Sequence, residues 1–128
     1  MIVLAIDLGD TTGYVYARKL KDGIALMHYG TCELGRPMPQ RFKPDVVVIE
    51  RPAFVGPGSR QLAYEEAIHK LKVTYGRKVR VVKPADWMQR FAHFTLPGRG
   101  ILASQHEKDA WRMAAWACDT FTVLAVSD

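Results

Sequence analysis

Apolar positions form short, dense runs in the first half of the chain and recur at helical spacing in the second half. The run over 2–7 is apolar up to its final carboxylate and predicts a buried strand. Runs over 13–18 and 24–31, joined by a turn at 21–23, predict two more strands and an antiparallel meander. The β-branched run over 45–50 predicts a buried parallel strand.

Helical spacing first appears after a Pro-Gly break at 57–58, where four apolar positions share one helix face. They are Tyr64, Ile68, Leu71 and Tyr75. Proline is tolerated in a first helical turn and opens a short helix at Pro84, and an S-x-x-E capping box opens the last helix at Ser104. The other expected elements are helices over 59–75, 84–91 and 104–117, a strand over 79–82, and loops over 35–44 and 96–100.

This order of elements predicts an α/β fold with a central mixed five-stranded sheet flanked by helices. In that sheet the antiparallel three-strand meander adjoins parallel strands, which helices connect as crossovers. The length of 128 residues fits a single domain over 1–128. The three tryptophans, Trp87, Trp111 and Trp116, are expected in its core.

Composition narrows the class of protein. With 48% hydrophobic and 24% charged residues, the chain has the makeup of a soluble globular protein. No apolar stretch approaches the ~20 residues of a membrane span, and Asp7 interrupts the first apolar run in a way that argues against a signal peptide. Cys32 and Cys118 lack metal-ligand spacing and are expected as reduced thiols. We therefore expect a cytoplasmic protein without a membrane partner.

The net charge of +5 is unevenly distributed. Between 67 and 100, a block of basic residues is accompanied by a single acid, Asp86. Such a block suits a polyanion, because neutralising phosphates releases counterions. A solvated basic face explains the same block equally well. The basic residues are Lys70, Lys72, Arg77, Lys78, Arg80, Lys83, Arg90 and Arg99.

Two carboxylates, Asp7 and Glu50, close apolar strands, where an ionised group is costly to bury without a positive partner. If the two strands are neighbours, both side chains reach the same end of the sheet. Asp109 shares a helix face with His106 and brings the set to three acids. Acids gathered in one place repel each other unless hard divalent cations such as Mg²⁺ lie between them. Two such ions ~3.5–4 Å apart can clamp the attacking water and the leaving oxygen of a phosphodiester.

Three segments, "IDLGDTTGY", "VVVIERPAF" and "HEKDA", resemble in this order the RuvC family of Holliday junction resolvases, which has a ribonuclease H-like fold. The resemblance covers 2–117. It implies a metal-dependent endonuclease that resolves four-way DNA junctions by symmetric phosphodiester hydrolysis, as a homodimer without a nucleotide cofactor. It also implies Mg²⁺, with Mn²⁺ as a substitute, at two ions per active site. By resemblance, the catalytic and metal-binding residues are Asp7, Glu50, Asp109 and His106, of which the histidine assists the metal or the attacking water.

The resemblance also assigns residues outside the acid set. Gly9, Thr12 and Gly13 match the turn after the first acid, and Phe54 resembles the aromatic that wedges into the junction. The dimer residues expected on the long middle helix are Tyr64, Ile68, Leu71 and Tyr75. The candidate DNA contacts are Phe54, Arg51, Lys83, Arg90 and Arg99. Two residues separate the turn glycine from T-G-Y where the cellular enzymes have three. The region over 83–103 is short, which indicates a compact, phage-type member in a bacterial or phage-infected cytoplasm.

Each candidate acid also has a structural alternative. The alternatives are a turn cap for Asp7, a salt bridge to Arg51 for Glu50 and one to Arg112 for Asp109. Other functions stay open for the whole chain, because a fold does not fix a function. They are another ribonuclease H-like nuclease for RNA–DNA hybrids or rRNA processing (YqgF type), a nucleotide-binding module, and a non-catalytic junction-binding protein. The nucleotide-binding architecture needs two domains, for which 128 residues are too few.

Overall fold

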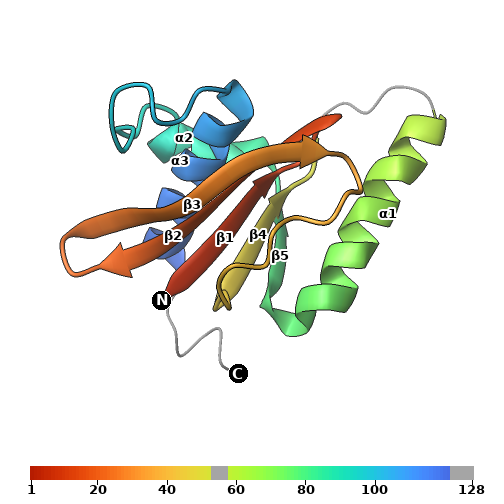
Figure 1. The fold of residues 1–128 in the computed structure, drawn as a ribbon, viewed down its shortest axis with the longest axis horizontal. Helices are drawn as coiled ribbons and strands as arrows, with labels where there is room; N and C mark the ends of the chain where they lie inside the picture. Colours follow the sequence, from red (N-terminus) through yellow and green to blue (C-terminus); the bar gives the residue numbers. More distant parts are fainter. Residues whose placement is uncertain (53–57, 122–128) are drawn as a thin grey trace.

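The computed structural model describes residues 1–52 and 58–121, which form a five-stranded sheet with helices packed on it (Figure 1). The strands are β1 (Ile2–Asp7), β2 (Thr11–Leu20), β3 (Gly23–Glu33), β4 (Val46–Glu50) and β5 (Val79–Val82). The helices are α1 (Gly58–Tyr75), α2 (Pro84–Phe91) and α3 (Gln105–Thr120), with a 3-10 turn, η1 (Gly76–Lys78), before β5. The predicted order of elements is confirmed, although β2, β3 and α3 extend further than their patterns indicate.

The sheet is mixed, as predicted, with the strand order β3-β2-β1-β4-β5. The antiparallel meander consists of β1, β2 and β3, and the parallel strands β4 and β5 continue the sheet on the other side of β1. Since β1 and β4 are neighbours, their register sets Asp7 opposite Glu50. Backbone pairing therefore brings the two strand-end acids together.

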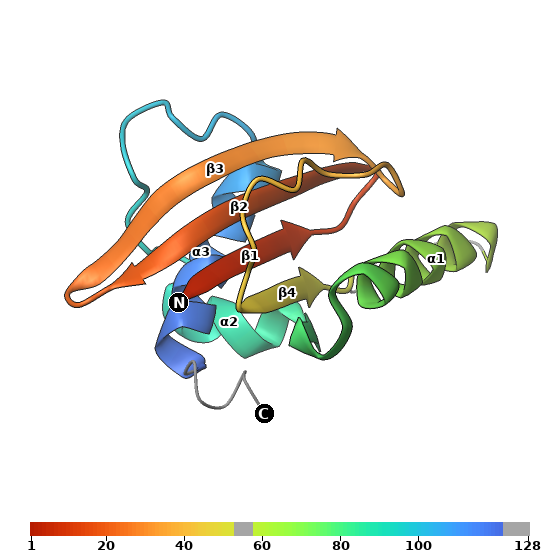
Figure 2. The ribbon, with the colours of Figure 1, turned by 60° about the horizontal axis from the view of Figure 1, so that its bottom comes forward.

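Alternate residues of the central strands supply two separate cores, because successive side chains of a strand point to opposite faces. Val3 and Ala5 of β1 pack with α2 and α3 on one face, whereas Leu4 and Ile6 pack with α1 on the other. Figure 2 shows α2 and α3 together under the sheet, with α1 apart from them beyond β4. By the same alternation, Asp7 points to the face that α2 and α3 cover.

The helix α1 packs its apolar stripe on its own sheet, which corrects the expectation that this stripe faces a second subunit. Tyr64 and Ile68 are only 6% and 2% exposed. Leu71 and Tyr75 pack against the same core. An apolar helix face is buried against the nearest apolar surface, and here that surface is the β1–β4 face of the same chain.

The structure also places the two cysteines and the three tryptophans. Cys32 and Cys118 are free thiols. Trp87 and Trp111 lie in the core at 1% and 3% exposed, and Trp116 packs against the same core while partly buried. Across 1–52 and 58–121, we find no helix with the length and hydropathy to cross a membrane.

Candidate active site

Asp7 and Glu50 lie side by side where two parallel strands end. Glu50 alternates with Val46 and Val48, which pack in the core under α2 and α3, so both carboxylates point into one layer. Each acid is 7% exposed. The two carboxyl groups interact directly, because each one shifts the pKa of the other.

Burial raises the pKa of both carboxyl groups. Desolvation raises the pKa of Asp7 above its usual value, against the lowering effect of a hydrogen bond with His106. Desolvation likewise raises the pKa of Glu50 to about 7. The negative charge of Asp109 adds to the rise in both pKa values. A cation would stabilise the ionised form of two buried acids that lie this close together.

His106 stands in the first turn of α3, which begins at the predicted capping box of Ser104 and Glu107. Its Nδ1 lies 3.0 Å from Asp7 Oδ2. Because an ionised carboxylate only accepts hydrogen bonds, the histidine donates through Nδ1–H. The side chain is 43% exposed, so its other ring nitrogen, Nε2, can exchange protons with water.

The turn after Asp7 lets α3 approach the sheet closely. Thr12 Oγ1 donates to the Gly9 carbonyl oxygen at 2.8 Å and closes the turn. Gly13 pairs with Asp7 between β1 and β2, and a Cβ on it would lie 2.5 Å from the carbonyl carbon of His106. A glycine is required where another backbone approaches a strand this closely. The predicted turn residues therefore position His106 against Asp7.

Trp87 is a site residue that the sequence did not reveal. Its indole Nε1–H donates to Glu50 Oε2 from the middle of α2, and its side chain is 1% exposed. A tryptophan in an amphipathic helix is typical of a core position, and Trp87 does lie in the core. The available signal was weak, since a buried indole N–H needs some acceptor but does not indicate which one.

Asp109 lies near the acid pair but does not complete a preformed metal cage. Its Oδ1 accepts a hydrogen bond from Gln105 Nε2 at 2.9 Å, one turn earlier on α3. Within the part of the chain that the structure describes, no group of three or more His, Cys, Asp and Glu is arranged to hold a metal ion. The predicted cluster of three acids is therefore present as a close pair, Asp7 and Glu50, with Asp109 beside it.

The donor set fits a divalent metal ion. Carboxylate oxygens are the ligands that Mg²⁺ prefers and that Mn²⁺ also accepts. Asp7 and Glu50 are close enough to shift each other's pKa, so a cation bound by both would offset the repulsion between their ionised forms. Asp109 would join this set if its hydrogen bond with Gln105 were replaced by ligation of the ion.

The structure decides against the alternatives for the three acids. Thr12, not Asp7, closes the turn after β1. Arg51 pairs with a glutamate of α1, and Arg112 donates to a backbone carbonyl at 3.2 Å. The site acids are therefore not neutralised by the arginines that the sequence offered as partners. Phe54, the candidate wedge, lies outside the described residues.

Two arginines lie at the end of the sheet where Asp7 and Glu50 lie, and each is paired with another carboxylate. Arg51 directly follows Glu50 and pairs with Glu65. Arg60, near the start of α1, pairs with Asp10 in the turn after β1. The two arginine side chains are 41% and 49% exposed, so both reach water at this end of the sheet. Arg60 was missed from the sequence because its partner lies far away along the chain.

The basic block does not form one patch beside the acids. Lys83 is exposed and follows β5, whose last residue pairs with Glu50, so it lies at the acid end of the sheet. Arg90 pairs with Asp119 at 3.1 Å near the end of α3, ~20 Å along that helix from its first turn. Arg99 is exposed on the loop before α3. The basic residues of η1 and of the start of β5 lie toward the opposite end of the sheet.

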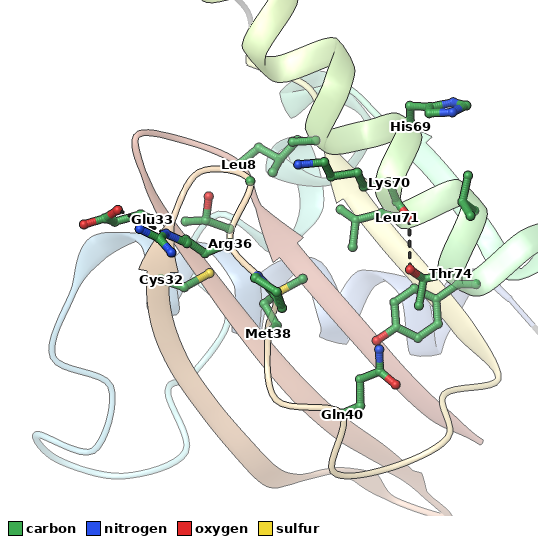
Figure 3. Close-up of a pocket in the computed structure, with 16 residues that line it drawn as sticks. Leu8, Cys32, Glu33, Arg36, Met38, Gln40, His69, Lys70, Leu71 and Thr74 are labelled. Carbon is green, nitrogen blue, oxygen red and sulfur yellow. Dashed lines mark hydrogen bonds and ion pairs between the residues drawn. The ribbon is translucent and has the colours of Figure 1, made fainter.

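A cavity of about 370 Å³ lies away from the acids, between α1 and the segment after β3 (Figure 3). Its lining includes Leu8, Met38 and Leu71, and it belongs to the face of the sheet that α1 covers. Asp7 and Glu50 point to the other face. The cavity is therefore not part of the acidic site.

The site thus consists of acids at the ends of two inner strands of a mixed five-stranded sheet, with a third acid on a following helix. No family model matches the chain, and no curated protein matches it in sequence. The solved structure of Thermus thermophilus RuvC matches 94% of this chain and 96% of its own, with 20% identity and a TM-score of 0.65.

T. thermophilus RuvC in complex with a Holliday junction substrate matches 91% of this chain and 92% of its own, with 17% identity and a TM-score of 0.66. The chain therefore has the ribonuclease H-like fold in the form seen in RuvC, and the predicted fold class is confirmed.

Proposed function

We propose that this protein is a divalent-metal-dependent endonuclease that cuts four-way DNA junctions symmetrically. The observation that carries the proposal is the buried Asp7–Glu50 pair, with His106 hydrogen-bonded to Asp7 and Asp109 beside it. The shared fold with RuvC, one structure of which holds a Holliday junction substrate, supports a junction as the substrate. The net charge of +5 suits a polyanionic partner.

The proposed chemistry gives each site residue a separate task. A bound divalent ion supplies positive charge at the phosphate and lowers the pKa of a water ligand. Asp7, Glu50 and Asp109 would hold the metal. The predicted ions are Mg²⁺ and Mn²⁺, with two ions per site. His106, fixed through Nδ1–H on Asp7, accepts a proton from the attacking water at Nε2.

The test is cleavage of a labelled four-way junction in Mg²⁺ and in Mn²⁺, beside a matched duplex and an RNA–DNA hybrid, with EDTA as the control. We expect paired symmetric nicks in the junction with either metal, none with EDTA, and an intact duplex. Cleavage of the hybrid with the junction untouched would assign the chain to the other nuclease class. Tight junction binding without cleavage in either metal would leave a binding protein.

We infer that Arg51 and Arg60 contact phosphates of the junction. Both lie at the same end of the sheet as Asp7 and Glu50, are about half exposed and already make charge-assisted pairs, with Glu65 and Asp10. A guanidinium binds phosphate with the same bidentate geometry that it uses for a carboxylate. Phosphates of the DNA therefore compete with the carboxylates of Glu65 and Asp10 for these two arginines.

The variant Arg60→Gln is expected to weaken junction binding at all sequences and to reduce the slope of log K against log salt by about one. Fluorescence anisotropy with a labelled junction over a series of KCl concentrations measures both quantities. Arg18→Gln is the control, because Arg18 is also an exposed arginine but pairs with Ile2, at the end of β1 opposite to Asp7. Equal losses in the two variants would contradict the inference.

We propose that the homodimer forms through the outward face of α1. That face carries Leu62, Glu66, His69 and Val73 at helical spacing, and the two apolar residues are 69% and 72% exposed. If two copies of α1 pack antiparallel, Leu62 of one copy meets Val73 of the other, and Glu66 meets His69. A surface that complements itself in this way suits a twofold interface.

The variant Leu62→Glu is expected to convert the dimer to a monomer at micromolar concentration. It removes apolar burial on both copies and places two carboxylates near the interface, a loss of roughly 3 kcal/mol or about a hundredfold in dissociation constant. Sedimentation equilibrium measures the change. Leu20→Glu is the control, because Leu20 is also exposed, at 47%, but lies at the end of β2. A Leu62→Glu protein that stays dimeric would exclude this interface.

A further inference from the structure

Trp87 is held in an unusual environment for a core tryptophan. It lies on α2 in the core between the sheet and α3, at 1% exposed. Its one polar atom, the indole Nε1–H, donates to Glu50 Oε2. The hydrogen bond is also one of the two largest influences on the pKa of Glu50, which it lowers against the effect of burial.

A second buried tryptophan in the same core donates its indole N–H to an acceptor outside the acidic site. Trp111 is 3% exposed on α3, and its Nε1–H donates to the Thr95 carbonyl oxygen at 2.8 Å. A backbone carbonyl is a sufficient acceptor for a buried indole. The bond from Trp87 to a buried carboxylate is thus not needed merely to satisfy the indole.

The hydrogen bond from Trp87 restricts the orientation of the Glu50 side chain, which backbone pairing alone leaves open. Backbone pairing fixes where the Cα of Glu50 lies, but the side chain has three torsions beyond it, and a long acidic side chain keeps much rotamer freedom when unrestrained. A hydrogen bond from an immobile, fully packed ring holds one carboxyl oxygen, Oε2, at a defined place. The other oxygen, Oε1, then has a restricted set of positions beside Asp7.

We propose that Trp87 is a positioning residue: it holds Glu50 through Nε1–H in the orientation that binds the divalent ion. The inference rests on the proposed function in one respect, that the acid pair binds such an ion. Partners of this kind, which orient a ligand without touching the ion, contribute to metal affinity because the ligand no longer loses rotamer freedom on binding. Trp87 therefore acts on metal binding and not directly on the reacting phosphate.

The experiment compares Trp87→Phe with Trp111→Phe, since each removes a buried indole N–H from the same core. Isothermal titration calorimetry of the full chain with Mn²⁺ measures affinity independently of cleavage. We expect the dissociation constant to rise about tenfold in Trp87→Phe and to stay within about twofold of wild type in Trp111→Phe. Junction cleavage should show the same separation, with a higher half-saturating Mn²⁺ concentration in Trp87→Phe and a similar rate at saturating Mn²⁺.

A variant that retains the ring volume covers the case in which Trp87→Phe does not fold. Replacing Trp87 with β-(3-benzothienyl)alanine puts sulfur in place of the N–H and leaves the packing intact. The same loss of Mn²⁺ affinity is expected. Unchanged affinity in this protein, or an equal loss in Trp111→Phe, would overturn the inference.

The outcomes separate this inference from the proposed function. Wild type that binds Mn²⁺ more tightly than Trp87→Phe but cuts no junction would support the role of Trp87 and overturn the proposed activity. Wild type that cuts the junction, with Trp87→Phe equal to it in Mn²⁺ affinity, would support the activity and overturn the role of Trp87. Wild type that binds no Mn²⁺ would overturn the role of Trp87 directly.

Discussion

The variant Glu50→Gln is expected to lose junction cleavage by about a thousandfold or more and yet to melt at a higher temperature than wild type in metal-free buffer. Activity falls because a neutral amide is a poor ligand for a hard cation. Stability rises because the amide has no charge to desolvate beside Asp7. A gain in stability with a loss of activity is typical of a functional residue whose buried charge destabilises the folded protein.

The gain in stability depends on pH, with a sign set by the raised pKa of Glu50. Burial raises this pKa from 4.5 to about 7, so the folded protein keeps a proton that the unfolded chain releases. Wild-type stability therefore falls as pH rises through this interval and stays reduced above it. The difference in pKa corresponds to at most about 3 kcal/mol, or several degrees in melting temperature.

Thermal melts in EDTA at about pH 5 and about pH 8 measure this effect. The gain from Glu50→Gln is expected at the higher pH and is expected to vanish at the lower one, where wild-type Glu50 is protonated. Glu33→Gln is the control, because the side chain of Glu33 is 82% exposed at the end of β3, and it should melt like wild type at both pH values. A gain of the same size at both pH values would show that relief of a buried charge is not its cause.

The variant Gly13→Ala is expected to abolish most of the activity although it replaces none of the site acids. The new Cβ would lie 2.5 Å from the carbonyl carbon of His106 and 2.7 Å from its carbonyl oxygen. These are backbone atoms, which cannot rotate away, so α3 has to move from β2. A shift of about 1 Å between His106 and Asp7 is expected to lower the rate about a hundredfold. Overpacking of this kind also lowers stability by about 1–3 kcal/mol.

Single-turnover cleavage rates and thermal melts of Gly13→Ala measure the two effects. Gly58→Ala is the matched control, because a Cβ on Gly58 would meet no atom within 4 Å. The control is expected to cut at the wild-type rate. If Gly13→Ala cut the junction as fast as the control, the close approach of α3 to β2 would not be what places His106 at Asp7.

The strand-end acids were accessible from the sequence because each closes an apolar run, so its burial and its place at the end of a strand follow together. That Asp7 and Glu50 meet depends on the pairing of β1 with β4, which the local patterns left conditional. The capping box of Ser104 and Glu107 was equally accessible, because all of its contacts lie within one helical turn. These features depend on near neighbours in the chain or on one pairing of strands.

The features that escaped prediction depend on contacts between distant segments. The hydrogen bond from Trp87 to Glu50 joins α2 to β4, and the ion pair of Arg60 with Asp10 joins α1 to the turn after β1. An apolar stripe shows that a helix face is buried but not what covers it. For this reason the stripe of Tyr64 on α1 was assigned to a second subunit, although its own sheet covers it.

The pairing of β1 with β4 bears on which ion the site accepts. Paired strands lie ~4.8 Å apart because of backbone hydrogen bonds, so the span between the Cα atoms of Asp7 and Glu50 does not depend on packing in either core. Oxygen ligands lie about 2.0–2.1 Å from Mg²⁺ and about 2.3–2.6 Å from Ca²⁺. With the backbone span constant, the ionic radius that suits the pair is set by the lengths of an aspartate and a glutamate. We therefore expect that Asp7→Glu or Glu50→Asp, each a change of one methylene group, would alter the ion that the proposed site prefers.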